Sequence, residues 1–87
     1  MSSLTDRPEI GPVTARQLAA VGIADADELR AAGARQAFTR IRQRLDPGAC
    51  AHLLTALECA VRGVSAKELS GEDKAELRAW FRGLPPA

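Results

Sequence analysis

The chain has 87 residues, of which 46% are apolar, but its aromatic side chains are limited to Phe38, Trp80 and Phe81. This length and composition indicate one domain whose core is built from Leu, Val, Ile and Ala. The formal net charge of +1 does not mark a nucleic-acid binder, and no apolar run reaches the roughly 20 residues that a membrane-spanning helix needs.

Helical spacing dominates the sequence, and no stretch alternates apolar and polar residues over the length of a strand. We therefore expect an all-α fold. The expected arrangement is a compact five-helix bundle of the helix-hairpin-helix or SAM-like kind around a central apolar helix over residues 47–62. A single domain is expected over residues 1–87, with an ordered core over 8–83.

The first helix is predicted over residues 12–21, because Pro12 suits a first helical turn and Gly22 ends the helix. The apolar Ile23 follows directly after this glycine and is expected to pack into the core. The apolar face of this helix is expected to consist of Val13, Ala15, Leu18 and Ala19.

Two further helices are predicted over residues 26–32 and 34–45, separated by Gly33. Asp25, with Glu28 three residues later, has the pattern of a capping box at the start of the first of them. The second carries an apolar stripe at helical spacing: Ala34, Ala37, Phe38, Ile41 and Leu45.

The fourth helix is predicted over residues 47–62, with Asp46 as its cap, Pro47 in its first turn and Gly63 at its end. It is the most apolar helix and should form the centre of the core through Leu53, Leu54, Leu57, Ala60 and Val61.

The C-terminal part of the chain is expected to hold one short turn and a fifth helix. Ser65 is a candidate cap for the turn that carries Leu69. Ser70 caps the helix predicted over 71–82, whose first turn is acidic, as the helix dipole favours.

Catalytic and metal-binding groups are sparse. His52 is the one histidine, it has no partner in the sequence pattern, and it is expected at the surface. Cys50 and Cys59 point to opposite sides of the predicted fourth helix, so they cannot bridge each other. We predict no enzyme, no metal site and no cofactor. Two thiols that are expected to be buried or partly buried, and the lack of a signal pattern at the N-terminus, suggest the cytoplasm.

A tight turn precedes the first predicted helix, in the order Glu9-Ile10-Gly11-Pro12. This order resembles the helix-hairpin-helix motif of DNA repair and recombination proteins, in which a hairpin with two glycines around an apolar residue joins two helices. Backbone N–H groups at such a hairpin and at the helix that follows can bind a phosphate without reading sequence. The chain departs from the motif at Glu9, which stands at the first glycine.

Two interpretations of this hairpin stay open. In one, the turn contacts nucleic-acid phosphates through Gly11, Val13, Thr14 and Arg16. In the other, Gly11 and Pro12 simply form a turn that packs Ile10 against Ile23, which turn chemistry alone explains.

The third predicted helix carries the bases Arg35, Arg40, Arg42 and Arg44 and no acid. Arg40 and Arg44 lie on one side of the apolar stripe, and the other two lie on the opposite side. They either form a basic ridge that contacts nucleic-acid phosphates or an acidic partner, or they cover apolar surface with their aliphatic stems. Trp80 likewise has two interpretations, the edge of the core or an anchor in a protein interface.

The resemblance extends over most of the chain. From Ile10 to Leu77 the sequence resembles the C-terminal domain of the TfoX/Sxy family of bacterial competence regulators. The matching segments are 10–15, Leu18, 21–23, 29–30, 32–34, 37–38, 53–54, 56–58, Ala60, 62–63, Leu69 and 75–77. The chain departs from this family at Ala66, where a Trp is frequent just before the last helix.

The resemblance implies a non-catalytic interaction module with a role in DNA transformation or transcriptional co-activation. Its expected partners are DNA, bound weakly and without sequence preference, or a protein of the transcription machinery. The alternative is a structural domain that forms homodimers or other protein contacts and binds no nucleic acid. No membrane partner is expected.

Overall fold

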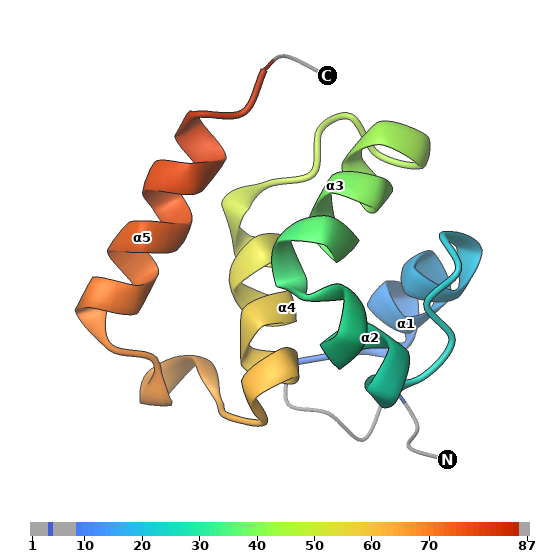
Figure 1. Cartoon of the computed structure of the whole chain (residues 1–87), viewed down its shortest axis with the longest axis horizontal. Helices are drawn as coiled ribbons and strands as arrows, with labels where there is room; N and C mark the ends of the chain where they lie inside the picture. Colours follow the sequence, from blue (N-terminus) through green and yellow to red (C-terminus); the bar gives the residue numbers. More distant parts are fainter. Residues whose placement is uncertain (1–3, 5–8, 86–87) are drawn as a thin grey trace.

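The structure, a computed structural model, describes Leu4 and residues 9–85. Within that part of the chain all regular secondary structure is helical, which confirms the all-α five-helix bundle (Figure 1). The start of the expected ordered core, at Pro8, lies outside the described residues. The elements are α1 (Pro12–Ala20), α2 (Ala26–Ala32), α3 (Ala34–Arg44), α4 (Ala51–Arg62), the short 3₁₀ helix η2 (Ala66–Glu68) and α5 (Gly71–Arg82).

Helix α4 lies at the centre, as its apolar composition predicts. It packs against α2, α3, α5 and η2, whereas α1 packs against α3. In Figure 1, α5 covers one side of α4 and α1 lies at the opposite side of the bundle. Leu54, Leu57 and Ala60 of α4 are completely buried. They belong to the same core cluster as Phe38 and Ile41 of α3. Most side chains of this cluster are aliphatic.

Side-chain caps fix the starts of α2 and α5. The Asp25 carboxylate accepts a 2.8 Å hydrogen bond from the Glu28 amide, and the Ser70 hydroxyl accepts one of 3.0 Å from the Asp73 amide. The Glu28 carboxylate reaches back to the amide of Ala24 at 3.4 Å, one residue before the cap itself. Both caps were predicted, and each satisfies an amide that the helix leaves unpaired.

The predicted start of the fourth helix is wrong. The Asp46 side chain accepts a hydrogen bond from the Gly48 amide at 3.0 Å, and its carbonyl accepts one from the Ala49 amide at 3.0 Å. Asp46 therefore closes a turn instead of capping a helix. Asp side chains readily form such hydrogen bonds to nearby backbone amides, in place of a helix cap. Cys50 is the N-cap and is exposed. The expectations that it lies within the helix and that its thiol is at least partly buried are therefore both wrong. The buried Ala49 anchors this turn to the core.

Three smaller expectations also fail. Leu45 is 44% exposed, because α3 ends at Arg44 and the chain turns away before the stripe is complete. Val13 is 63% exposed and Ala19 is also exposed, so the buried face of α1 is centred on Leu18. Ser65 makes no side-chain cap at η2.

Glycines join the first three helices. Gly22 lies between α1 and α2 at φ 89°, and its neighbours Val21 and Ile23 are both buried. Gly33 ends α2 and begins α3 at φ 84° and ψ 157°. A side chain at either position would be strained, since L-residues rarely adopt such a positive φ.

Candidate functional site

The turn that leads into α1 has a glycine-like backbone at Glu9, the position where the helix-hairpin-helix motif has its first glycine. Glu9 has φ 67°, and it is the one non-glycine residue in the described chain with a positive φ. Ile10 is 6% exposed and joins the core. Gly11 is the N-cap of α1 with an extended backbone. Glu9 thus adopts the conformation for which the motif uses glycine.

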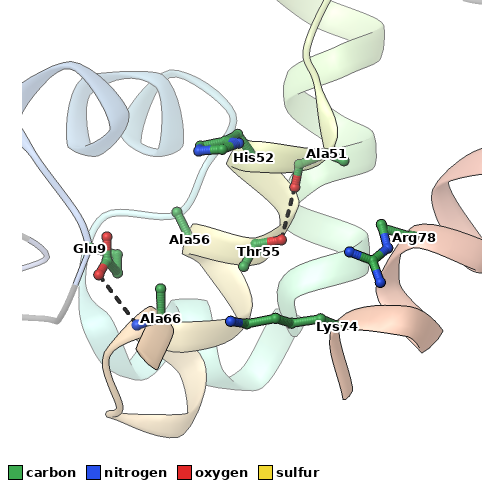
Figure 2. Close-up of a pocket in the computed structure, with 8 residues that line it drawn as sticks. All are labelled: Glu9, Ala51, His52, Thr55, Ala56, Ala66, Lys74 and Arg78. Atoms are coloured by element: carbon green, nitrogen blue, oxygen red, sulfur yellow. Dashed lines mark hydrogen bonds between the residues drawn. The ribbon is translucent and has the colours of Figure 1, made fainter. Parts of the chain in front are cut away.

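The carboxylate of Glu9 points toward η2. Its Oε1 accepts a hydrogen bond of 3.4 Å from the Ala66 amide (Figure 2). In the described part of the chain no side chain caps α1, and the carboxylate of Glu9 does not occupy the first-turn amides of that helix. The repulsion that Glu9 would exert on a bound phosphate is therefore reduced in this arrangement.

The N-terminal end of α1 is an open surface with partial positive charge. Its first-turn N–H groups have no acceptor within the helix, its first turn contains no acid, and Pro12 lacks the N–H that would otherwise be unpaired. A Cβ at Gly11 would have no other atom within 4 Å. Val13 and Arg16 are exposed and Thr14 is half-buried. The four residues Gly11, Val13, Thr14 and Arg16 of the expected hairpin site therefore lie together.

The arginines of α3 do not form one continuous ridge. The Arg35 guanidinium lies 5.9 Å from the centre of the Trp80 ring, and Arg42 donates a 2.7 Å hydrogen bond to the carbonyl of Pro85. These two arginines therefore connect α3 with α5 and with the segment that follows α5. Arg40 faces the other way, toward the Val21 carbonyl at 3.5 Å, and is half-buried. Arg44 is exposed at the end of α3.

Trp80 lies at the edge of the core. It is half-buried, and its ring meets Phe38 edge to face with 6.1 Å between ring centres. Phe81 meets Phe38 in the same manner at 5.8 Å. The placement fits the core-edge interpretation of Trp80, because its ring already has partners inside the domain.

A cleft of about 340 Å³ lies between α4 and α5, beside the hairpin (Figure 2). Its charged lining residues are Glu9, His52, Lys74 and Arg78, and its small ones are Ala51, Thr55, Ala56 and Ala66. His52 is exposed, as expected, at one end of this cleft. Sequence reasoning missed the cleft. The sequence shows that Lys74 and Arg78 are spaced to lie on one face of a helix. It does not show that this face packs beside α4.

The cleft has no evident catalytic arrangement. Glu9 is engaged by the Ala66 amide, and no hydrogen bond joins it to His52. The described residues contain no group of three or more side chains suited to hold a metal ion. Over the same residues, no helix is both long and apolar enough to span a membrane.

Ion pairs next to the cleft hold α4 and α5 together. The Arg62 guanidinium forms an ion pair of 2.7 Å with the Glu58 carboxylate within α4 and one of 2.9 Å with the Asp73 carboxylate of α5. The Ser70 hydroxyl, and then Arg62, hold the pKa of the Asp73 carboxyl below its ordinary value. Burial raises the pKa of the Cys59 thiol, and the nearby carboxylates of Glu9 and Glu58 raise it further.

A comparison with protein families identifies the family, and a comparison with solved structures finds similar chains. The TfoX C-terminal domain family matches residues 1–81. A crystal structure of an uncharacterized protein from Listeria monocytogenes, in a triclinic form, is similar at 34% identity with a TM-score of 0.88, covering 94% of this chain and 96% of that one. A tetragonal form of a protein of unknown function from the same organism gives 35% identity and a TM-score of 0.89, covering 95% and 100%. No functionally curated protein matches. The chain therefore belongs to the TfoX C-terminal domain family.

Proposed function

We propose that this domain is a non-catalytic docking module of a DNA-associated regulatory system, whose hairpin contacts duplex phosphates without reading sequence. The observation that carries the proposal is the N-terminal end of α1. Among the described residues no side chain accepts a hydrogen bond from its first-turn amides, the turn contains no acid, and it follows a turn in which Glu9 has a glycine-like backbone. Helix N-termini of this kind suit phosphate oxygens.

The contact is expected to be small. Arg35, Arg40 and Arg42 of α3 have partners inside the domain, which leaves Arg44 among the arginines of that helix. Together with Arg16 of α1, it gives two exposed cations among the residues predicted to contact nucleic acid. Neutralising two phosphates gives a slope of log affinity on log salt near −1.8, which amounts to about a tenfold loss between 50 and 200 mM salt. Binding should not depend on the base sequence.

Gly11→Asp tests this contact directly. Asp is a better N-cap than Gly, and its Cβ meets no atom here, so the variant should fold and gain a few tenths of a kcal/mol. Its carboxylate would occupy the first-turn amides and repel a phosphate. Fluorescence anisotropy with a labelled duplex at 50 mM salt should show at least a tenfold weaker affinity for this variant.

The matched control is Gly71→Asp, which makes the same change in charge at the start of α5, where a Cβ also meets nothing. Its DNA affinity should stay within twofold of the parent protein. Equal losses in the two variants would assign the effect to net charge. A parent protein that binds no duplex at 50 mM salt would disprove the proposal.

A further inference from the structure

We propose that the cleft between α4 and α5 binds an acidic peptide segment of a partner protein. The site is separate from the proposed DNA contact, since none of Gly11, Val13, Thr14 or Arg16 lines it. The cleft joins residues far apart in sequence, from the hairpin, α4, η2 and α5 (Figure 2).

The cations of the cleft outnumber its acids, since Glu9 is the one carboxylate among its lining residues. Lys74 and Arg78 lie one turn apart on α5, and in the described part of the chain neither side chain takes part in an ion pair. Two acids of these helices, Glu58 of α4 and Asp73 of α5, are both bonded to Arg62. Lys74 is half-buried in the cleft, so an incoming carboxylate would meet it partly shielded from water, where charge attraction is stronger.

The walls of the cleft let a main chain approach closely. Ala51, Ala56 and Ala66 contribute no more than a methyl group each. The Thr55 hydroxyl donates to the Ala51 carbonyl at 3.0 Å, which leaves its oxygen free to accept a hydrogen bond from a peptide N–H.

The lining offers both donors and acceptors, and this favours a peptide over nucleic acid. Lys74 and Arg78 donate, whereas Glu9 and the Thr55 oxygen accept. A peptide with acidic side chains offers carboxylates to Lys74 and Arg78, and backbone N–H groups to Glu9 and the Thr55 oxygen. A phosphodiester backbone has acceptors only, so it could not donate hydrogen bonds to Glu9 or to the Thr55 oxygen. The volume of about 340 Å³ suits one or two side chains of such a segment.

The test measures anisotropy of a fluorescein-labelled peptide of alternating Glu and Ala residues with blocked ends, at 50 and 150 mM salt. We expect saturable binding to the full chain, and none by a peptide with Lys in place of Glu. Arg78→Glu should weaken binding at least tenfold. Arg82→Glu, which reverses an exposed charge one turn further along α5 outside the cleft, should change it less than twofold.

Several results would overturn the proposal. These are no binding of the Glu peptide at 50 mM salt, equal losses in the two variants, or displacement of the peptide by unlabelled duplex, which would make the cleft a DNA site. Circular dichroism of both variants checks that they fold. Gly11→Asp should leave peptide binding unchanged, so failure of the DNA contact and failure of the cleft are distinguishable.

Discussion

Backbone conformation at single residues decides where the helices of this domain meet. Gly33 both ends α2 and begins α3, at φ 84° and ψ 157°, a region that only glycine enters readily. Gly11, in contrast, has φ −93°, which any residue adopts. The two glycines therefore differ in what they tolerate, although both face open space.

Gly33→Ala should lower the free energy of unfolding by about 1–3 kcal/mol through backbone strain alone. Gly11→Ala should change it by less than about 0.5 kcal/mol. Urea denaturation monitored by circular dichroism measures both. Similar losses in the two variants would contradict the assignment of strain to Gly33.

The two cysteines should differ sharply in reactivity. Cys50 is exposed, whereas Cys59 is completely buried, and burial next to Glu9 and Glu58 raises its pKa and keeps it a thiol at neutral pH. Iodoacetamide at pH 7.5 should label Cys50 in the native protein and Cys59 only after unfolding, as peptide mass mapping would show. Rapid labelling of Cys59 in a folded Cys50→Ser variant would contradict this placement.

Residue-level patterns predicted the glycine stops and the caps at Asp25 and Ser70, because these depend on neighbours a few positions away. The positive φ of Glu9 was not predicted from its type, since it depends on the hairpin around it and on the contact with Ala66. The signal that could have shown it was the motif position, which normally holds glycine.

At the scale of elements, α5 is attached to the bundle at both ends. Near its start Arg62 pairs with Asp73, and near its end Trp80 and Phe81 pack on Phe38. The apolar attachment is at the edge of the core, whereas the ion pair is partly exposed to water. The first should therefore be insensitive to pH and the second sensitive to it.

Arg62→Ala should lower the melting temperature by about 2–4 °C at pH 7, a modest amount because the ion pairs are partly exposed. The pKa of Asp73 is lowered in the folded state, so the stability it contributes is present above its unfolded pKa of about 3.9 and is lost as pH falls through the lower folded value. The difference between the two proteins should thus shrink below pH 4. Thermal scans at pH 7, 5 and 3 measure it.

The control for this experiment is Arg82→Ala, which removes an exposed charge of α5 that makes no ion pair among the described residues. It should leave the melting temperature nearly unchanged at each pH. A deficit in Arg62→Ala that stays constant from pH 7 to pH 3 would contradict the role of Asp73.

The extent of most helices followed from periodicity and punctuation, but their lateral contacts did not. The start of α4 was misplaced because Asp46-Pro47-Gly48 suits a helix start and a turn equally, and the burial of Ala49 decides between them. The predicted buried stripe on α3 is correct up to Ile41. Leu45 is exposed because the chain turns after the end of the helix. The cleft needs α4, α5 and the hairpin to meet, which no local pattern encodes.

At the scale of the whole molecule, the domain has a buried aliphatic core around α4 and two polar features at its surface. One is the open N-terminus of α1, and the other is the cationic cleft between α4 and α5. The arginine-rich helix, which stood out in the sequence, mostly serves internal contacts through Arg35, Arg40 and Arg42. Its composition therefore does not produce a continuous basic surface, because arginine also makes contacts that hold the domain together.

The proposed docking role is tested most directly by mapping amide shifts of the ¹⁵N-labelled chain during titration with a short duplex at 50 mM salt. We predict the largest changes at Gly11, Val13 and Thr14, with smaller ones at Arg16 and little change at Lys74 and Arg78. Changes centred on the cleft or on α5, or none at all at saturating duplex, would contradict a hairpin that binds phosphate.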